Sequence, residues 1–121
     1  MKYDNDNIFA KILRGEIPCK KIFENEFVLS FYDINPQKKI HALIIPKGPF
    51  IDLDDFIKNA KEKEILEFFK AISHVAKLLK ISNIEGGYRT ISNIAKNGGQ
   101  EVPHLHFHLF GGENVGKMVS N

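Results

Sequence analysis

The sequence predicts an α+β fold, in which an antiparallel sheet and its helices come from different stretches of one chain. Several short segments have the period-two alternation of strands, two segments have the apolar stripe of a helix, and turn-forming residues separate them. The 121 residues are 43% hydrophobic and 26% charged, which are ordinary values for a globular domain. We therefore expect one domain over residues 1–121, with a core at about 7–112 and a short tail at 113–121.

The first expected element is a short helix that begins after Asn7. Four apolar residues share one helical face, namely Ile8, Phe9, Ile12 and Leu13. Asn7 is a suitable N-cap, because its side-chain oxygen accepts a hydrogen bond from a free N–H group of the first turn. Gly15 is a typical residue for the end of a helix, so we expect the helix to stop there.

Three strands are expected in the next part of the chain. Residues 20–24 and 27–32 have strand composition and are separated by Asn25, which predicts a hairpin. A third strand is expected over residues 40–45 and ends at Pro46. Period two places His41 of this strand on the same face as Leu43 and Ile45.

A long helix over residues 60–80 is the clearest element of the sequence. Its apolar stripe has helical period and consists of Ile65, Phe68, Phe69, Ile72, Val75, Ala76 and Leu79. Asn59 and Glu62 have the spacing of a capping box at its start. His74 lies on the polar side, so we expect it at the surface. The acidic residues among 52–55 are expected in a solvated connection before this helix.

Two further strands are expected over about residues 87–93 and 105–110. The second of these overlaps the sequence His-Leu-His-Phe-His, whose three histidines are His104, His106 and His108. Alternate residues of a strand point to the same face, so the three imidazoles would lie together. Imidazoles titrate near neutral pH and need hydrogen-bond partners when buried, so three on one face predict a functional site. A metal site and a nucleophile with its neighbours both fit this pattern.

The loop before the three histidines favours the nucleophile. Gly98 and Gly99 allow positive φ and bring backbone N–H groups close to a ligand, as in a nest that binds an anion. A phosphate held beside an imidazole predicts attack on phosphorus. A zinc site would instead need a carboxylate or thiolate partner and an outer shell of hydrogen bonds.

Several separated stretches of the chain resemble the histidine-triad family. These stretches are Asn7 to Pro18, Asp33 to Gln37, His41 to Lys47, and Asn93, Gly98, Gln100 and Val102 together with the three histidines. Residues 109–112, which read Leu-Phe-Gly-Gly, favour the Hint branch over the branch of dinucleoside-polyphosphate hydrolases. The resemblance extends over about residues 7–112, which is nearly the whole chain.

This resemblance implies a five-stranded antiparallel sheet with one long and one short helix, continued across a two-fold homodimer. It implies a purine nucleoside 5′-phosphoramidate hydrolase that releases AMP or GMP through a covalent nucleotidyl-histidine. One alternative is a nucleotide-binding interaction module that has only residual hydrolysis and a protein as its real ligand. A second alternative, a three-histidine metal site, rests on the triad alone, and we expect neither a metal nor another cofactor.

The resemblance also assigns roles to the histidines. His106 would be the nucleophile, with its second ring nitrogen held by a backbone carbonyl so that the attacking nitrogen keeps its lone pair. His104 and His108 would flank the phosphate and stabilise developing charge. His41 resembles the fourth histidine of the family, which supports and orients the triad.

Other residues would bind the nucleotide. The Asn93 amide would donate to the phosphate or the leaving group, although an amide that only holds its loop is nearly as consistent with the sequence. Asp33 would accept from the ribose hydroxyls, and Gly99 and Gln100 would belong to the phosphate loop. Glu101 departs from the hydroxyl residue of many animal relatives and would repel a phosphate unless it faces solvent or a cationic leaving group. The purine pocket would be formed by Ile8, Phe9, Ile12, Phe31, Ile34 and Leu43.

Composition argues against several other classes of protein. The net charge of +2 is too small and too evenly spread for a nucleic-acid surface. No apolar stretch approaches the length of a membrane span, and residues 1–7 lack the hydrophobic core of a signal peptide. The single cysteine, Cys19, forms no internal disulfide and fits a reducing compartment, so we expect a cytoplasmic protein.

Overall fold

The computed structural model of the chain describes residues 2–118. The elements in chain order are α1 (Ile8–Leu13), β1 (Lys21–Glu24), β2 (Val28–Tyr32), β3 (Ile40–Pro46), α2 (Leu53–Asn59), α3 (Glu62–Leu78), the 3₁₀ helix η1 (Asn83–Glu85), β4 (Tyr88–Ile91) and β5 (Phe107–Gly111). The five strands form one antiparallel sheet, which confirms the α+β class and the five-stranded sheet. None of the helices within residues 2–118 is both long and apolar enough to cross a bilayer.

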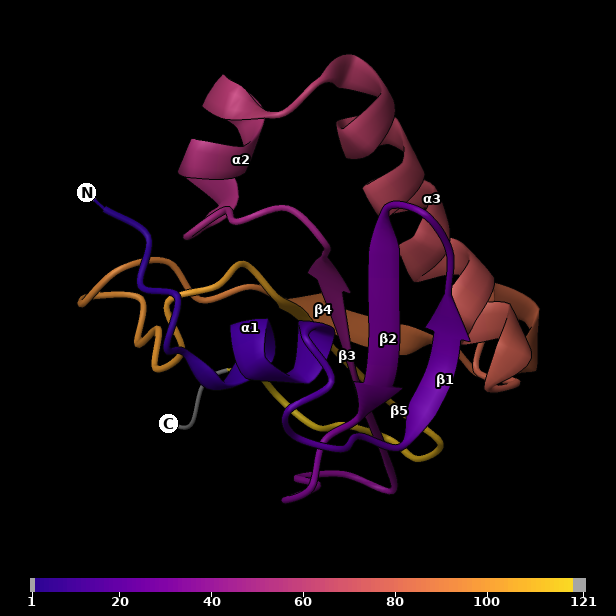
Figure 1. Cartoon of the computed structure of the whole chain (residues 1–121). Helices are drawn as coiled ribbons and strands as arrows, with labels where there is room; N and C mark the ends of the chain where they lie inside the picture. The colour runs from indigo at the N-terminus through magenta and orange to yellow at the C-terminus, as the bar shows by residue number, and fades with distance from the viewer. Residues whose placement is uncertain (1, 119–121) are drawn as a thin grey trace.

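The sheet has the strand order β1-β2-β3-β5-β4, so β3 lies at its centre and β4 forms one edge (Figure 1). Alternate residues of β3 enter two different apolar clusters. Ala42 and Ile44 pack with α3 on one face, and Leu43 and Ile45 pack with Phe9 of α1 on the other. Period two, which predicted a common face for His41, Leu43 and Ile45, therefore describes this strand correctly.

The helix α1 begins and ends as predicted. The Asn7 side-chain oxygen accepts from the backbone N–H of Ala10 at 2.9 Å, which caps the first turn. Gly15 follows the helix with φ of 79°. Because Phe9 and Ala10 are buried, this short helix is fastened to the sheet face that also carries His41.

The helix α2 was not predicted, since residues 52–55 were expected in a solvated connection. Asp52 instead accepts from the Asp55 N–H at 2.8 Å and caps the helix, and acidic residues fill its first turn, where the helix dipole favours them. Phe56 of α2 is completely buried in the core cluster that includes the buried residues of the long helix α3. The following helix α3 starts at Glu62 with Lys61 as its N-cap, so the capping box proposed for Asn59 and Glu62 was also wrong.

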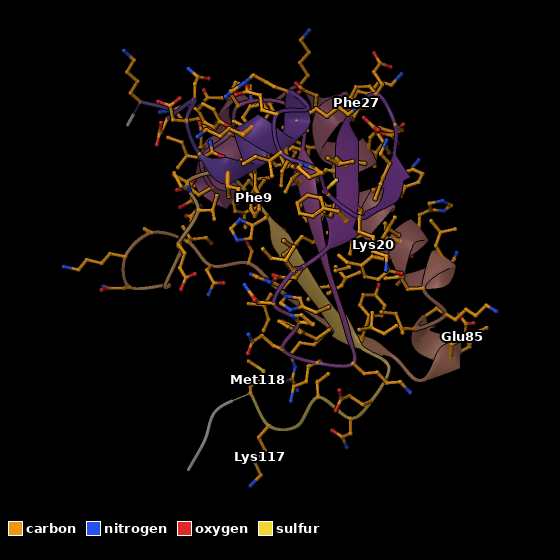
Figure 2. The ribbon with its side chains drawn as sticks, turned by 60° about the horizontal axis from the view of Figure 1, so that its bottom comes forward. Phe9, Lys20, Phe27, Glu85, Lys117 and Met118 are labelled. Carbon is orange, nitrogen blue, oxygen red and sulfur yellow. The ribbon has the colours of Figure 1, made fainter. Side chains whose placement is uncertain are left out.

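The histidine segment is only partly a strand. Hydrogen bonding of β5 begins at Phe107, so His104 and His106 precede the strand and His108 lies within it, facing Leu43 of β3. The Leu105 N–H donates to the Phe50 carbonyl at 2.8 Å, which holds this segment against the chain that follows β3. Beyond β5 the tail is tied to the edge strand, because the Arg89 side chain donates to the Gly116 carbonyl at 2.6 Å, and Lys117 and Met118 are the last described residues (Figure 2).

Candidate active site

A cavity of about 390 Å³ lies where the ends of β2, β3 and β5 meet the loop before β5. Its lining consists of Asp33, Asn35, Gln37, His41, Asn93, Gly99, Glu101, Val102, His106 and His108. Seven of the residues predicted for the site are in this list, which brings together side chains up to 75 positions apart in the sequence. A larger cavity of about 830 Å³ beside β4 and the tail contains no histidine or cysteine, so it offers no such chemistry.

His106 is held in one tautomer. Its Nδ1 lies 2.7 Å from the backbone carbonyl of His104, and because a carbonyl only accepts, Nδ1 must carry the proton. The Nε2 atom therefore keeps a lone pair on a ring that lines the cavity. Burial lowers the pKa of His106 below its ordinary value of 6.5, while the bond to the His104 carbonyl and the charges of Asp33 and Glu101 oppose this shift. His106 is thus a neutral imidazole with a free nitrogen, the form a nucleophile requires.

His41 sets the tautomer of His108. The Gln37 backbone N–H donates to His41 Nδ1 at 3.1 Å, so a neutral His41 carries its proton on Nε2. That nitrogen lies 2.9 Å from His108 Nδ1, which must accept, and 3.5 Å from a carboxylate oxygen of Asp33. His108 therefore carries its own proton on Nε2. Burial, together with the neighbouring His106 and His41, lowers the pKa of His108 to about 4.

The same hydrogen bonds argue against a metal ion at this site. One ligand atom each from Asp33, His41 and His108 lies within 4.8 Å of the others, a spacing that could hold a cation. A neutral imidazole binds a metal through its unprotonated nitrogen. In His41 that nitrogen is Nδ1, which already accepts from the Gln37 N–H. A metal on Nε2 would therefore require His41 to change tautomer and lose this hydrogen bond.

His104 has a different place from the one predicted. It is completely buried, its Nε2 donates to the Pro46 carbonyl at 2.9 Å, and its Nδ1 accepts from the Tyr3 hydroxyl. Burial lowers the pKa of His104 to about 4. Both ring nitrogens are engaged inside the protein and His104 does not line the cavity, so its ring is not placed to flank a phosphate there, contrary to the expectation. It acts on the cavity through its carbonyl oxygen, which holds His106.

The glycine loop is built more tightly than the sequence suggested. Of the two glycines, Gly99 alone has a positive φ, of 75°, whereas both were expected to have one. Gly98 is required for a different reason, since a Cβ there would meet the Ile94 carbonyl oxygen at 2.3 Å. Gly99 lines the cavity and Gly98 does not, so one of the two glycines is placed to approach a ligand.

Two amide side chains hold this loop in shape. The Asn93 Nδ2 donates to the Gly98 carbonyl at 2.7 Å, which is the loop-holding role that the sequence left open, although Asn93 also lines the cavity. The Gln100 Nε2 donates to the carbonyls of Ile51 and Val102, at 2.7 and 3.0 Å. The predicted contribution of Gln100 to the site is therefore structural.

The residues expected to form the purine pocket do not line the cavity. Phe9, Phe31 and Leu43 are buried in the core on this side of the sheet, and Ile12 packs against them. Phe9 supports the site from below, because its ring meets the His106 ring edge-on at 4.9 Å between centroids. Figure 2 labels Phe9 on α1. Ile8 and Ile34 are exposed, at 40% and 84%, so in this single chain neither encloses a base.

The charge of the cavity is unusual for a site that receives a phosphate. Asp33 and Glu101 contribute two carboxyl groups, and the lining contains neither lysine nor arginine. Asp33 is oriented by the Asn35 N–H, which donates to its Oδ1 at 2.8 Å. Glu101 is exposed. An anion in this cavity would therefore depend on neutral donors, such as His108 Nε2–H and backbone N–H groups.

Comparison with known proteins identifies the family of this chain. The family profile of the HIT domain matches residues 14–115. The chain belongs to the HIT domain family. A HIT-like protein of Azospirillum brasilense is 51% identical to this HIT protein over 118 residues, which cover 98% of this chain and 95% of the relative. The purine nucleoside phosphoramidase of Escherichia coli K12 is 38% identical over 117 residues, which cover 96% and 95%.

The solved structures lead to the same family. The crystal structure of a HIT family hydrolase from Legionella pneumophila Philadelphia 1 matches this HIT protein with a TM-score of 0.80 and 36% identity, over 89% of this chain and 94% of that one. The predicted family is thereby confirmed. Relatives named as a hydrolase and as a phosphoramidase support a hydrolase type of function at the level of the family.

Proposed function

We propose that this HIT protein hydrolyses purine nucleoside 5′-phosphoramidates, releasing AMP or GMP and an amine. The observation that carries the proposal is the hydrogen bond from His106 Nδ1 to the His104 carbonyl, because it leaves Nε2 unprotonated beside the cavity. The Escherichia coli relative named purine nucleoside phosphoramidase, which is 38% identical, supports the substrate class.

The proposed reaction has two displacements at phosphorus. In the first, His106 Nε2 forms a bond to phosphorus, the P–N bond to the amine breaks, and the departing nitrogen takes a proton from solvent, while His108 Nε2–H donates a hydrogen bond to a phosphate oxygen. In the second, water attacks the nucleotidyl-histidine, the bond from phosphorus to His106 breaks, and a proton of the water passes to solvent. Asp33 would accept from the ribose hydroxyls, and Asn93 and the Gly99 backbone would lie beside the phosphate.

The experiment that tests this function measures AMP release from an adenosine 5′-phosphoramidate, with and without a chelator. We expect steady release that the chelator does not change. Loss of activity with the chelator would support a metal site. Nucleotide binding without release would support the interaction module.

Glu101 provides a prediction about the leaving group. Its exposed carboxylate lines the cavity beside His106, in a lining that holds no cationic side chain. Phosphoramidates of amines that carry a second, positive charge should therefore be preferred over those of neutral amines. In Glu101→Ser, the ratio of kcat/KM for a lysine-linked over a neutral phosphoramidate should fall about 5-fold, and less at high salt because of screening.

The matched control is Glu26→Ser, which removes an exposed carboxylate that lies outside the cavity. This variant should keep the wild-type ratio. An unchanged ratio in Glu101→Ser would mean that the carboxylate only shapes its loop.

We further propose a two-fold homodimer. The edge strand β4 pairs only with β5 within the described chain, and α3 exposes Leu66, Phe69 and Leu78 at 55%, 40% and 48%. An open strand edge and an apolar helix face both favour association with a second copy.

Light scattering at micromolar concentration should give twice the chain mass of 13.8 kDa. Phe69→Glu should shift the protein toward monomer, Lys70→Glu on the same helix should not, and a monomeric wild type would contradict the proposal.

We also propose a cytoplasmic location with no nucleic-acid partner. The single free cysteine, Cys19, and the small net charge of +2 support this.

A further inference from the structure

We propose that Tyr3 is a positioning residue for the nucleophile, acting on His106 through His104. The inference rests on the proposed role of His106. Tyr3 lies in the N-terminal segment, which runs beside the loop that precedes β5 (Figure 1). It is 101 positions away from His104 in the sequence, and it is not part of the cavity lining.

The direction of each hydrogen bond in this chain follows from its acceptor. Pro46 offers only a carbonyl, so His104 Nε2 must carry the proton and Nδ1 must accept. The Tyr3 hydroxyl lies 2.5 Å from Nδ1 and is therefore the donor. Burial raises the pKa of Tyr3, which keeps the phenol protonated. Both ring nitrogens of His104 are thus hydrogen-bonded, and the backbone carbonyl of His104 accepts from His106 Nδ1.

Loss of the Tyr3 hydroxyl would leave a buried acceptor without a partner. His104 is completely buried, so no solvent reaches Nδ1 unless the ring or the chain moves. The carbonyl that holds His106 belongs to the same residue. Rotation of the ring alone leaves this carbonyl in place, but a shift of the His104 backbone that gives the ring a new partner moves the acceptor on which the tautomer of His106 depends.

The N-terminal segment is itself well anchored. The Asn7 side chain donates to the Asp4 carbonyl at 2.7 Å, and its oxygen caps α1. That helix places Phe9 against the His106 ring. Tyr3 also meets the His104 ring edge-on at 5.6 Å between centroids. One short segment thus contacts both histidines from the side away from the cavity.

The test is Tyr3→Phe, which removes one hydroxyl and keeps the ring, with Tyr32→Phe as the matched control. Tyr32 lies on β2 beneath the Lys20 ammonium group. In single-turnover experiments, Tyr3→Phe should slow formation of the nucleotidyl-histidine about 10-fold and leave KM unchanged, because Tyr3 does not line the cavity. Tyr32→Phe should match the wild type. A wild-type rate in Tyr3→Phe, or a change in KM alone, would overturn the inference.

Nitrogen NMR of the histidines gives a readout that does not depend on turnover. In Tyr3→Phe, the His104 Nδ1 resonance should shift, and the His106 Nδ1 proton should exchange faster with solvent. A wild type that cleaves no phosphoramidate would defeat the proposed function. Unchanged His104 and His106 resonances in a folded Tyr3→Phe would defeat the positioning role instead.

Discussion

His106→Ala should lower phosphoramidate turnover by several orders of magnitude, about 10⁴-fold or more, while AMP still binds. The reason is geometric, because the bond from His106 Nδ1 to the His104 carbonyl leaves Nε2 unprotonated on a ring that lines the cavity. His108 presents a protonated Nε2, and both nitrogens of His104 are engaged in the interior. Neither can replace the lost nucleophile.

The measurement combines single-turnover AMP release with AMP binding by calorimetry. His74→Ala is the matched control, since it removes an exposed imidazole on α3 and should leave turnover unchanged. His104→Ala and His108→Ala should lose less activity than His106→Ala. Turnover of His106→Ala close to that of the wild type would assign the nucleophile to another residue.

Local patterns in the sequence predicted most strands of the sheet and the sheet face to which the site belongs. Period two placed His41 with Leu43 and Ile45, and the structure has these residues on the sheet face that carries α1. The same period placed three histidines together, but it described a strand that begins only at Phe107. The segment before it is held by contacts with distant parts of the chain, such as the Phe50 carbonyl.

Long-range contacts explain what the sequence did not predict. Tyr3 and Pro46 complete the hydrogen bonds of His104, and no spacing within the histidine segment signals either of them. The helix α2 had a local signal, because Asp52 stands three residues before Asp55 at a capping distance. The sequence alone favoured a solvated connection here, because a short helix needs tertiary contacts to be stable. The burial of Phe56, which stabilises α2, depends on the tertiary fold.

Expectations were most exact where a particular hydrogen-bond partner was predicted. The predicted backbone acceptor for His106 exists, and it is the carbonyl of His104. Expectations were least exact for apolar residues, because an apolar side chain suits both burial in the core and contact with a base. Phe31 and Leu43 are both fully within the core, so their composition could not distinguish the two roles.

Acidification should destabilise the protein before its carboxylates titrate, because His104 is buried in its neutral form. The ordinary pKa of 6.5 applies to the unfolded chain, and the folded value is about 4. Between these values the unfolded state binds a proton that the folded state does not, so the free energy of unfolding rises with pH. The contribution is complete above 6.5 and is lost as pH falls toward 4. A shift of this size corresponds to about 3 kcal/mol.

Urea unfolding at one fixed protein concentration, compared at about pH 7.5 and about pH 4.5, measures this loss, to which His104 should contribute about 2–3 kcal/mol. The pKa values of His106 and His108 are also lowered by burial, so they act in the same direction. His104→Gln should be less stable at neutral pH but should lose clearly less stability between the two conditions. His74→Gln, which removes an exposed imidazole, is the matched control. Equal stability of the wild type at both pH values would contradict a neutral, buried His104, and with it the hydrogen bonds that hold the His106 acceptor in place.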